Sequence, residues 1–262
     1  MSYYKIFLIT YIMSYNALAG ITATNVEKKY ASISGPTGVS KSAVQRINIG
    51  FANTTGNTKT LNLNAKYSLS HMIQSKKYKP FKYNFQTTGY LTKNNSKKTA
   101  EEYTALLNGE QALKYQWLSY VSVGWLTNKF KNFQNKYMLA IGLGKVFIQN
   151  KEHRLVLKIG PACNIEQYYN KQKDNIYSSL NEYIEYRYLI NPTSKFYMKL
   201  GAVENFDDIS NDYETTGLIG LNFALNENIS ITLEQELAYD NLPPEGFKKS
   251  DSKSIIRVGY KF

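Results

Sequence analysis

The chain holds few side chains suited to acid–base chemistry, and its two histidines are the first to consider. A serine nucleophile needs a base such as imidazole within hydrogen-bond reach. His71 and His153 are the only histidines among 262 residues. The strand pattern described below places both near the same end of separate, non-adjacent hairpins, so neither can serve a serine relay at the opposite end. We therefore predict no catalytic residues and no enzyme, although a carboxylate pair could work without histidine.

Metal and cofactor chemistry has little support in the sequence. Cys163 is the only cysteine, which excludes an internal disulfide and favours simple packing as a small apolar residue. The sequence contains no CxxC pair, no metal-spaced set of Cys and His, and no phosphate-binding glycine loop between a strand and a helix. The oxygen ligands of Asp207, Asp208, Asn211 and Asp212 lack the spacing of a calcium loop. We predict no cofactor and no metal site.

Most charged residues alternate with apolar ones. In ISITLEQELAY, Glu234 and Glu236 fall on the face opposite Leu233 and Leu237, and in SIIRVGYKF Arg257 falls between Ile256 and Val258. Side chains two residues apart in a strand share a face, so these charges and those of Glu214, Glu185 and Arg187 are predicted to line one interior. Cross-strand ion pairs there could brace and block the interior, or they could line a narrow pore. The alternation assigns to the same face Arg46, Lys66, Lys82, Glu102, Glu110, Lys114, Arg154, Lys158, Lys199 and Lys261.

The elements that position these charges are strands. Runs of about ten or more residues match the length a tilted strand needs to cross a bilayer, whereas ordinary strands average about five or six. The apolar face of these runs suits lipid, and a mean hydropathy of −0.42 fits alternation because the two faces cancel. We predict strands near 44–54, 59–72, 80–92, 101–115, 117–129, 135–149, 153–168, 176–190, 195–205, 212–225, 229–241 and 251–262.

Three positions resist the pattern. Glu182 and Gln235 fall on the apolar face of their strands, and Glu182 costs little if it lies above the hydrocarbon. Gly160-Pro161 interrupts a strand and suggests a bulge or the outer rim, because proline cannot donate to the ladder.

The connectors alternate between mostly short turns and longer polar loops. Short turns on the periplasmic side and longer loops outside are typical of transmembrane barrels, and a chain that starts and ends on one side needs an even strand number. Closure also removes strand edges, which lipid does not tolerate. We predict an all-β fold, a transmembrane antiparallel up-and-down β-barrel of about 12 strands.

The carboxy-terminal segment, DSKSIIRVGYKF, is a strand that ends on the last residue. Its apolar face carries Val258, Tyr260 and Phe262. A final amphipathic strand with a terminal Phe resembles the signal read by the barrel-assembly machinery of bacterial outer membranes. We predict that these three residues form such a signal, and that the machinery is a partner.

The amino terminus predicts export. Lys5 is the only charge before Glu27, Ile6 to Met13 is mostly apolar, and Ala17-Leu18-Ala19 fits a cleavage site. The apolar run falls short of the roughly 20 residues of a spanning helix. We expect a signal peptide at 1–19, a flexible periplasmic lead-in at 20–43 and the barrel at 44–262, in the outer membrane of a Gram-negative bacterium.

Composition adds two expectations about the surface. The 23 tyrosines suit aromatic girdles at the membrane–water interface, although a compositional bias explains part of the excess. The net charge of +12 suits basic outer loops that face lipopolysaccharide phosphates, or else a solvated lysine-rich surface. Nucleic acid is a poor partner because the basic residues form no stripe. The loop lysines in question include Lys97, Lys98, Lys129, Lys131, Lys136, Lys248 and Lys249.

Three stretches go beyond a generic barrel. Residues 50–67 carry a Thr-Gly-Asn-Thr turn, Ile159-Gly160-Pro161 opens a long hairpin, and residues 241–262 combine Pro243-Pro244 with the final strand. Together they resemble the YdiY-like salt-induced outer membrane protein family, which is of unknown molecular function, over residues 44–262. The resemblance implies a barrel in the outer membrane and supplies no catalytic residues.

The function expected from these observations is a non-enzymatic, monomeric envelope protein with a structural or salt- and stress-related role. The alternative is a narrow passive channel for ions or small solutes, and an envelope enzyme comes third. Barrels of about eight strands are filled and those of 16 or more conduct, so a size of about 12 strands fits both a closed barrel and a channel.

Overall fold

A computed structural model describes residues 43–55, 60–73, 80–94, 97–170, 173–244 and 246–262. The expected signal peptide, most of the lead-in and the 56–58 part of the Thr-Gly-Asn-Thr turn lie outside these residues. Within the described part of the chain, no helix is long and apolar enough to span a membrane.

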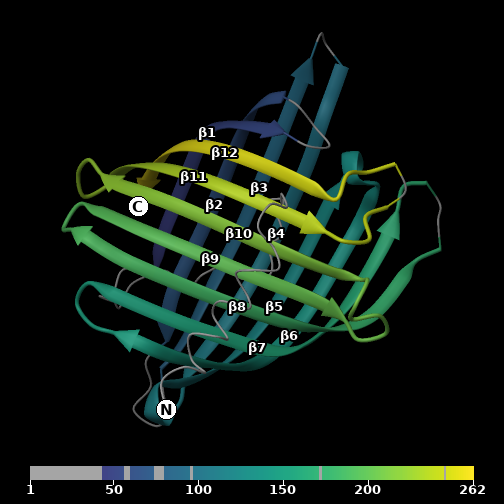
Figure 1. The fold of residues 1–262 in the computed structure, drawn as a ribbon. Coiled ribbons are helices and arrows are strands. Elements are labelled where there is room, and N and C mark those ends of the chain that lie inside the picture. The colour runs from purple at the N-terminus through teal and green to yellow at the C-terminus, as the bar shows by residue number, and fades with distance from the viewer. Residues whose placement is uncertain (1–42, 56–59, 74–79, 95–96, 171–172, 245) are drawn as a thin grey trace, which may run out of the picture.

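Twelve antiparallel strands close into a barrel, as the sequence predicts. Each strand pairs with its neighbours in the chain, and the first pairs with the last, in agreement with an up-and-down meander (Figure 1). The strands are β1 (Val44–Thr55), β2 (Thr60–Ile73), β3 (Phe81–Asn94), β4 (Lys97–Ala112), β5 (Trp117–Asn128), β6 (Phe133–Gln149), β7 (His153–Tyr168), β8 (Asn175–Asn191), β9 (Ser194–Asn205), β10 (Tyr213–Ala224), β11 (Ile229–Asp240) and β12 (Ser250–Lys261).

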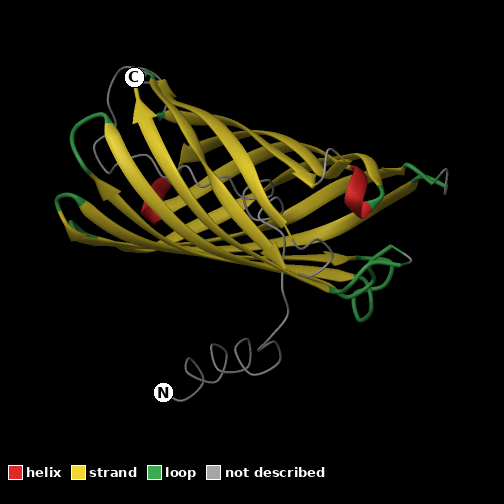
Figure 2. Ribbon diagram, turned by 90° about the horizontal axis from the view of Figure 1, so that it is seen from above, coloured by secondary structure: helices red, strands yellow, loops and turns green. Residues whose placement is uncertain are grey.

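The barrel has two ends, which we name by the chain. The terminal rim carries the start of β1, the end of β12 and the connectors 113–116, 150–152, 192–193 and 225–228. The distal rim carries the end of β1, the start of β12 and the described connector residues 129–132, 169–170, 173–174, 206–212, 241–244 and 246–249. The short 3₁₀ helices η1 (Lys114–Gln116) and η2 (Lys129–Lys131) lie at opposite ends of the strands (Figure 2).

The β3–β4 hairpin differs from the prediction. The polar stretch 94–100, expected as a loop, is mostly strand, and its ladder continues to Asn94 opposite Lys97 after an irregularity between Thr92 and Lys93. Lys97 and Lys98 are therefore strand residues rather than loop lysines. Polar side chains do not prevent backbone pairing, and the hairpin projects beyond its neighbours (Figure 1).

Two smaller expectations are also corrected. β4 ends at Ala112 rather than near residue 115, because Tyr115 and Gln116 adopt positive φ values of 55° and 64° in η1. Lys114, expected in the interior, is consequently exposed in that turn. The register between β6 and β7 is the same on both sides of Gly160-Pro161, so no bulge forms there.

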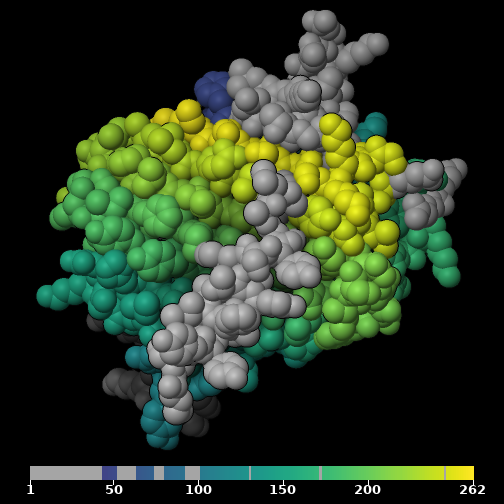
Figure 3. All heavy atoms as spheres, in the orientation of Figure 1, coloured from purple at the N-terminus to yellow at the C-terminus, as the bar shows by residue number. Residues whose placement is uncertain are grey.

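The two faces of the wall alternate as predicted. In β12, Ile256 and Val258 are 57% and 56% exposed, whereas Ile255 and Arg257 are 2% exposed. The outward aliphatic residues form a belt between two girdles of aromatic residues, one near each rim. Figure 3 shows the outer face of the green and yellow strands. Outward aromatics near the terminal rim include Phe81, Tyr83, Trp117, Phe147, Tyr186, Tyr188, Tyr260 and Phe262, and those near the distal rim include Tyr103, Trp125, Tyr137, Tyr169, Tyr213 and Tyr239.

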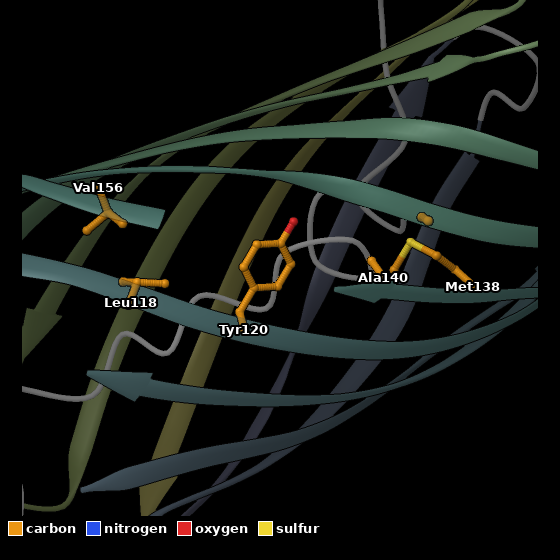
Figure 4. Close-up of a cluster of buried hydrophobic side chains, with 6 residues drawn as sticks. Leu118, Tyr120, Met138, Ala140 and Val156 are labelled. Atoms are coloured by element: carbon orange, nitrogen blue, oxygen red, sulfur yellow. The ribbon is translucent and has the colours of Figure 1, made fainter. Parts of the chain in front are cut away.

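Part of the interior is apolar. The buried cluster lies on the inner face of β5, β6 and β7, with the front of the wall cut away in Figure 4. Tyr120 lies across Gly142 of β6, whose missing side chain would otherwise occupy the place of the ring. The cluster consists of Leu118, Tyr120, Met138, Ala140, Val156 and Ala162.

Candidate functional site

The lumen is the candidate site, because the predicted charges face it. They do not form one network but belong to three clusters, which we call the seam, distal and terminal clusters. The seam cluster holds Glu234, Glu236 and Arg257, the distal cluster holds Glu214, and the terminal cluster holds Glu185 and Arg187.

The seam cluster is built around Arg257, next to the β1–β12 junction that closes the barrel. Its guanidinium pairs with Glu234 of β11 and donates to the amide oxygen of Asn64 (2.9 Å) and to the hydroxyl of Tyr90 (3.0 Å). Asn64 and Tyr90 belong to β2 and β3, so the side chain crosses β1. It does so over Gly50, its direct partner in the ladder.

A second side chain reaches Glu234 in the same way. The hydroxyl of Tyr197 on β9 donates to Glu234 on β11 at 2.5 Å, and its ring lies over Gly220 of β10. Gly220 is opposite both residues in the two ladders. The carboxylate is thus held from both sides, and a side chain at Gly220 would displace the ring.

Lys253 extends the seam cluster across the lumen. Its ammonium lies 4.3 Å from the centre of the Tyr90 ring and 3.5 Å from the carboxylate of Glu102 on β4. Glu102 also accepts a hydrogen bond from Asn128. Glu236, predicted to brace Arg257, is instead the ladder partner of Lys253 and adds to the negative field around it.

The distal cluster is centred on Lys136 of β6. Its ammonium pairs with Glu166 of β7 and with Glu214 of β10, the latter at 2.7 Å. Tyr168 and Tyr177 donate to the two oxygens of Glu166 at 2.6 and 3.0 Å. Because β7, β8 and β9 separate β6 from β10 in the wall, the contact between Lys136 and Glu214 passes through the lumen.

Two further ion pairs join separated strands. Lys131 of η2 and Asp251 of β12 lie 2.6 Å apart although they start from nearly opposite parts of the wall. Lys158 of β7 pairs with Glu110 of β4 across β5 and β6. We call these two pairs, together with Lys136–Glu214 and Lys253–Glu102, the crossing pairs, because each is an ion pair between separated strands.

The terminal cluster is centred on Glu185 of β8. Its carboxylate lies 3.0 Å from Arg187 Nε and 3.8 Å from Arg154 Nη1, and it accepts a 2.7 Å hydrogen bond from Tyr183. The ring of Tyr183 in turn lies 5.4 Å from the ammonium of Lys158. This contact connects the terminal cluster to one crossing pair.

The two histidines face outward near the terminal rim. His153 stacks on Tyr188 at 4.7 Å between ring centres and shares a 2.8 Å hydrogen bond with Tyr186, and His71 packs edge-on against Tyr83. Among the described residues, neither histidine is hydrogen-bonded to a serine. The same part of the chain holds no group of three or more His, Cys, Asp or Glu arranged for a metal ion.

The acidic loop 206–212 at the distal rim is held by its own hydrogen bonds. Asp208 accepts from Ser210 and Asn211 at 3.3 and 2.9 Å, and Asp212 accepts from Asn205 at 2.7 Å. Burial raises the pKa of Asp212 above the usual value for an aspartate.

The predicted loop lysines divide into two groups. Lys129, Lys248 and Lys249 lie exposed in distal-rim connectors, and Lys249 donates to Asn241 at 2.9 Å. Lys131 pairs with Asp251 instead of facing outward. Lys136, also expected in an outer loop, is a buried strand residue.

Sequence reasoning missed several charged lumen residues, among them Lys136, Glu166, Lys195, Asp240, Asp251 and Lys253. Counting back in twos from Arg257 would have found Lys253 and Asp251. Counting back in twos from Ala140 would likewise have found Lys136, because the alternation is unbroken from Asn135 onward.

The predicted assembly signal lies on the outer face of the terminal rim. Val258, Tyr260 and Phe262 are all exposed, and the rings of Tyr260 and Phe262 meet edge-on at 5.0 Å. The backbone N–H of Phe262 donates to the carbonyl oxygen of Gln45 at 3.1 Å. The last residue is thereby attached to β1.

Three solved structures of outer-membrane proteins have a similar fold. The NanC porin aligns with a TM-score of 0.54 at 13% identity, over 82% of this chain and all of the porin. The COG4313 outer membrane channel from Pseudomonas putida F1 aligns with a TM-score of 0.53 at 12% identity, over 88% and 100%. The outer membrane phospholipase of Salmonella typhi aligns with a TM-score of 0.51 at 10% identity, over 93% and 98%. At these identities the likeness shows the fold alone.

Sequence comparison gives the family. The chain is 20% identical to the uncharacterized protein YdiY of Escherichia coli (strain K12) over 248 residues. The alignment covers 92% of each chain. A family model described as "Protein of unknown function, DUF481" matches residues 47–262, nearly the whole described barrel. The chain therefore belongs to the DUF481 family of proteins of unknown function.

Proposed function

We propose that this barrel is a non-enzymatic structural protein of the outer membrane, with a lumen closed by ion pairs. The observation that carries the proposal is the contact of Lys136 with Glu214, which joins β6 to β10 through the interior. An open pore would require these side chains to lie along the wall and face water.

The other crossing pairs support closure at further points. Lys253 and Glu102 are both buried, and so is Asp251. Lys136 and its second partner Glu166 are buried as well. Charges taken out of water are tolerated only when they are paired and hydrogen-bonded. A lumen whose charges neutralise each other through its interior gives mechanical coupling between distant strands and leaves little room for solute.

Location and partners follow from the outer surface. An aliphatic belt between two girdles of aromatic residues suits a bilayer. The start of β1 and the end of β12 lie on the side with mostly short turns, which suits a periplasmic terminal rim. The exposed Lys129, Lys248 and Lys249 would then meet lipopolysaccharide phosphates at the distal rim. We propose a monomer that is exported by a signal peptide and inserted by the barrel-assembly machinery. A salt- or stress-related role is supported by the family resemblance alone.

A narrow passive channel is the second candidate. It is favoured by the likeness in fold to the NanC porin and to the COG4313 outer membrane channel, and by the polar inner face. In this case the crossing pairs would form a constriction that opens and closes.

Planar-bilayer recording of the purified, refolded protein separates the two candidates. A closed structural barrel gives no steps above the baseline of detergent alone, whereas reproducible conductance steps would establish the channel. A lipid-hydrolysis assay on the same sample tests the non-enzymatic part, with no product expected because both histidines face outward near the terminal rim.

A further inference from the structure

The charges of the inner face are separated along the barrel. Near the terminal rim, within three residues of a strand end, the inward positions carry five cations and the carboxylate of Glu110. Near the distal rim the corresponding positions carry more acids than bases, namely Glu166, Glu214, Asp240 and Asp251 with Lys136 and Lys253. The cations near the terminal rim are Arg46, Lys82, Arg154, Lys195 and Lys261.

Two of the ladders at this end place like charges directly opposite each other. Arg154 of β7 faces Arg187 of β8, and Arg46 of β1 faces Lys261 of β12. Like charges in direct cross-strand positions destabilise a sheet. Glu185 compensates the first pair, since it lies 3.0 and 3.8 Å from the two guanidiniums. The second pair has no carboxylate of this kind among its described contacts.

Two of the cations lack a partner. Arg46 and Lys195 make no hydrogen bond or ion pair with the described residues. Lys195 instead lies in the repulsive field of Arg46, Arg187 and Lys199, with Glu185 as the opposing carboxylate. Arg46 and Lys195 belong to β1 and β9, which β10, β11 and β12 separate, so their charges meet through the lumen.

At the distal end Glu214 faces Asp240 directly in the ladder between β10 and β11, but most of the carboxylates there have a cation as partner. Glu166 and Glu214 share Lys136, and Asp251 pairs with Lys131. The crossing pairs use the cations available there. At the terminal end the arginines also remain reachable by water, because the side chains of Arg154 and Arg187 are 19% and 15% exposed.

From this arrangement we infer that the inward cations near the terminal rim form a binding site for a soluble, multivalent oxyanion that carries phosphate or carboxylate groups. The guanidinium forks of Arg46, Arg154 and Arg187 match the geometry of such oxygens, and the lysines add point charges. A multivalent anion fits best because the cations come from different strands around the barrel. The site opens at the terminal rim, so it does not depend on whether the lumen conducts.

Isothermal titration of the full chain in a non-ionic detergent tests this inference. The probes are inorganic tripolyphosphate and citrate, at an ionic strength fixed with sodium chloride. We expect saturable binding of at least one probe, and the stronger one identifies phosphate or carboxylate as the preferred chemistry. The Arg46→Gln/Lys195→Gln variant should bind at least tenfold more weakly. This variant removes charges without a protein partner, so the barrel should keep its heat-modifiable migration on gels.

The matched control removes two charges from the outside of the same rim. Lys145 lies on the outer face of β6 against Trp117, and Lys151 is exposed in the 150–152 turn. Lys145→Gln/Lys151→Gln should leave the affinity unchanged. No saturable binding of either probe, or equal loss of affinity in the two double variants, would overturn the inference. The Arg154→Gln/Arg187→Gln variant should weaken binding as well, and its unchanged affinity would count against the site. Bilayer recordings test lumen closure separately, so the two proposals can fail independently.

Discussion

Gly50 lies directly beneath the side chain of Arg257 where the first and last strands meet. The two residues are partners in the β1–β12 ladder, and a Cβ on Gly50 would lie 2.8 Å from both the Cα and the Cγ of Arg257. It would also lie 2.0 Å from the carbonyl oxygen of Ile256. The missing side chain lets the strands approach and lets the guanidinium cross to Asn64 and Tyr90.

We therefore expect Gly50→Ala to destabilise the barrel, by about 1–3 kcal/mol if it behaves as an overpacked core. Denaturant unfolding in lipid vesicles, followed by tryptophan fluorescence, measures the change. The control is Gly217→Ala, because a Cβ there meets only Leu200 Cδ2 at an ordinary 3.5 Å. Equal stability of the two variants would show that the close approach at the seam is unimportant.

The buried pair of Arg257 and Glu234 gives a second prediction. Arg257→Met leaves the Glu234 carboxylate without its cation, and removing one partner of a buried pair typically costs about 3–5 kcal/mol. The double variant Arg257→Met/Glu234→Leu removes both charges and should recover most of that loss. Unfolding free energies of the wild type, both single variants and the double variant complete the cycle. Additive losses in the double variant would contradict a direct pair.

The strand pattern of this fold could be predicted from sequence, because a wall with lipid on one side and polar contacts on the other imposes strict alternation. Arg257 and Glu234 were placed on the inner face by counting in twos, and their pairing needed only that β11 and β12 be neighbours. The polar composition around Lys97 and Lys98 wrongly predicted a loop, whereas both residues lie in β4 and pair with β3.

The crossing pairs could not be predicted, because they depend on the shape of the lumen. No local pattern indicates that Lys136 reaches Glu214 across three intervening strands. The inward direction of Lys136 itself could have been predicted, because the alternation is unbroken from Asn135 to Ala140. Glycine positions carried an unused signal, since Gly50 and Gly220 mark the places where a side chain from a neighbouring strand passes over.

Loss of the distal crossing pairs should open the lumen. The Lys131→Ala/Lys136→Ala variant removes both cations that hold Asp251, Glu166 and Glu214. We expect conductance steps in planar bilayers where the wild type shows none, with preference for cations because the carboxylates remain. Lys129→Ala/Lys145→Ala removes two outward charges and should stay closed. If the first variant is also closed, these pairs do not close the barrel.

The acidic loop at the distal rim predicts a pH effect on stability. Burial raises the pKa of Asp212, and the carboxylate of Glu214 acts in the same direction. A carboxyl whose pKa is higher in the folded state binds its proton more readily when folded, so stability falls as pH rises from the usual aspartate value through the raised one. Asp212→Asn keeps the shape and should be more stable at pH 7, with a flatter pH dependence. Asp207→Asn, in the exposed part of the loop, is the control, and the same flattening there would rule out a specific effect.

A substitution of Phe262 should separate the folding of the barrel from its delivery to the outer membrane. The ring of Phe262 is 62% exposed, and its main structural contact is the backbone hydrogen bond to Gln45, which Phe262→Ala retains. Refolding of the purified variant into detergent should therefore resemble that of the wild type. If Phe262 is read by the assembly machinery, the variant should nevertheless accumulate less heat-modifiable barrel in outer-membrane fractions of cells. Phe147→Ala removes an exposed aromatic ring near the same rim and serves as the control. Equal amounts of the two variants in the outer membrane would show that the terminal ring carries no signal, and a refolding defect confined to Phe262→Ala would show that its role is structural.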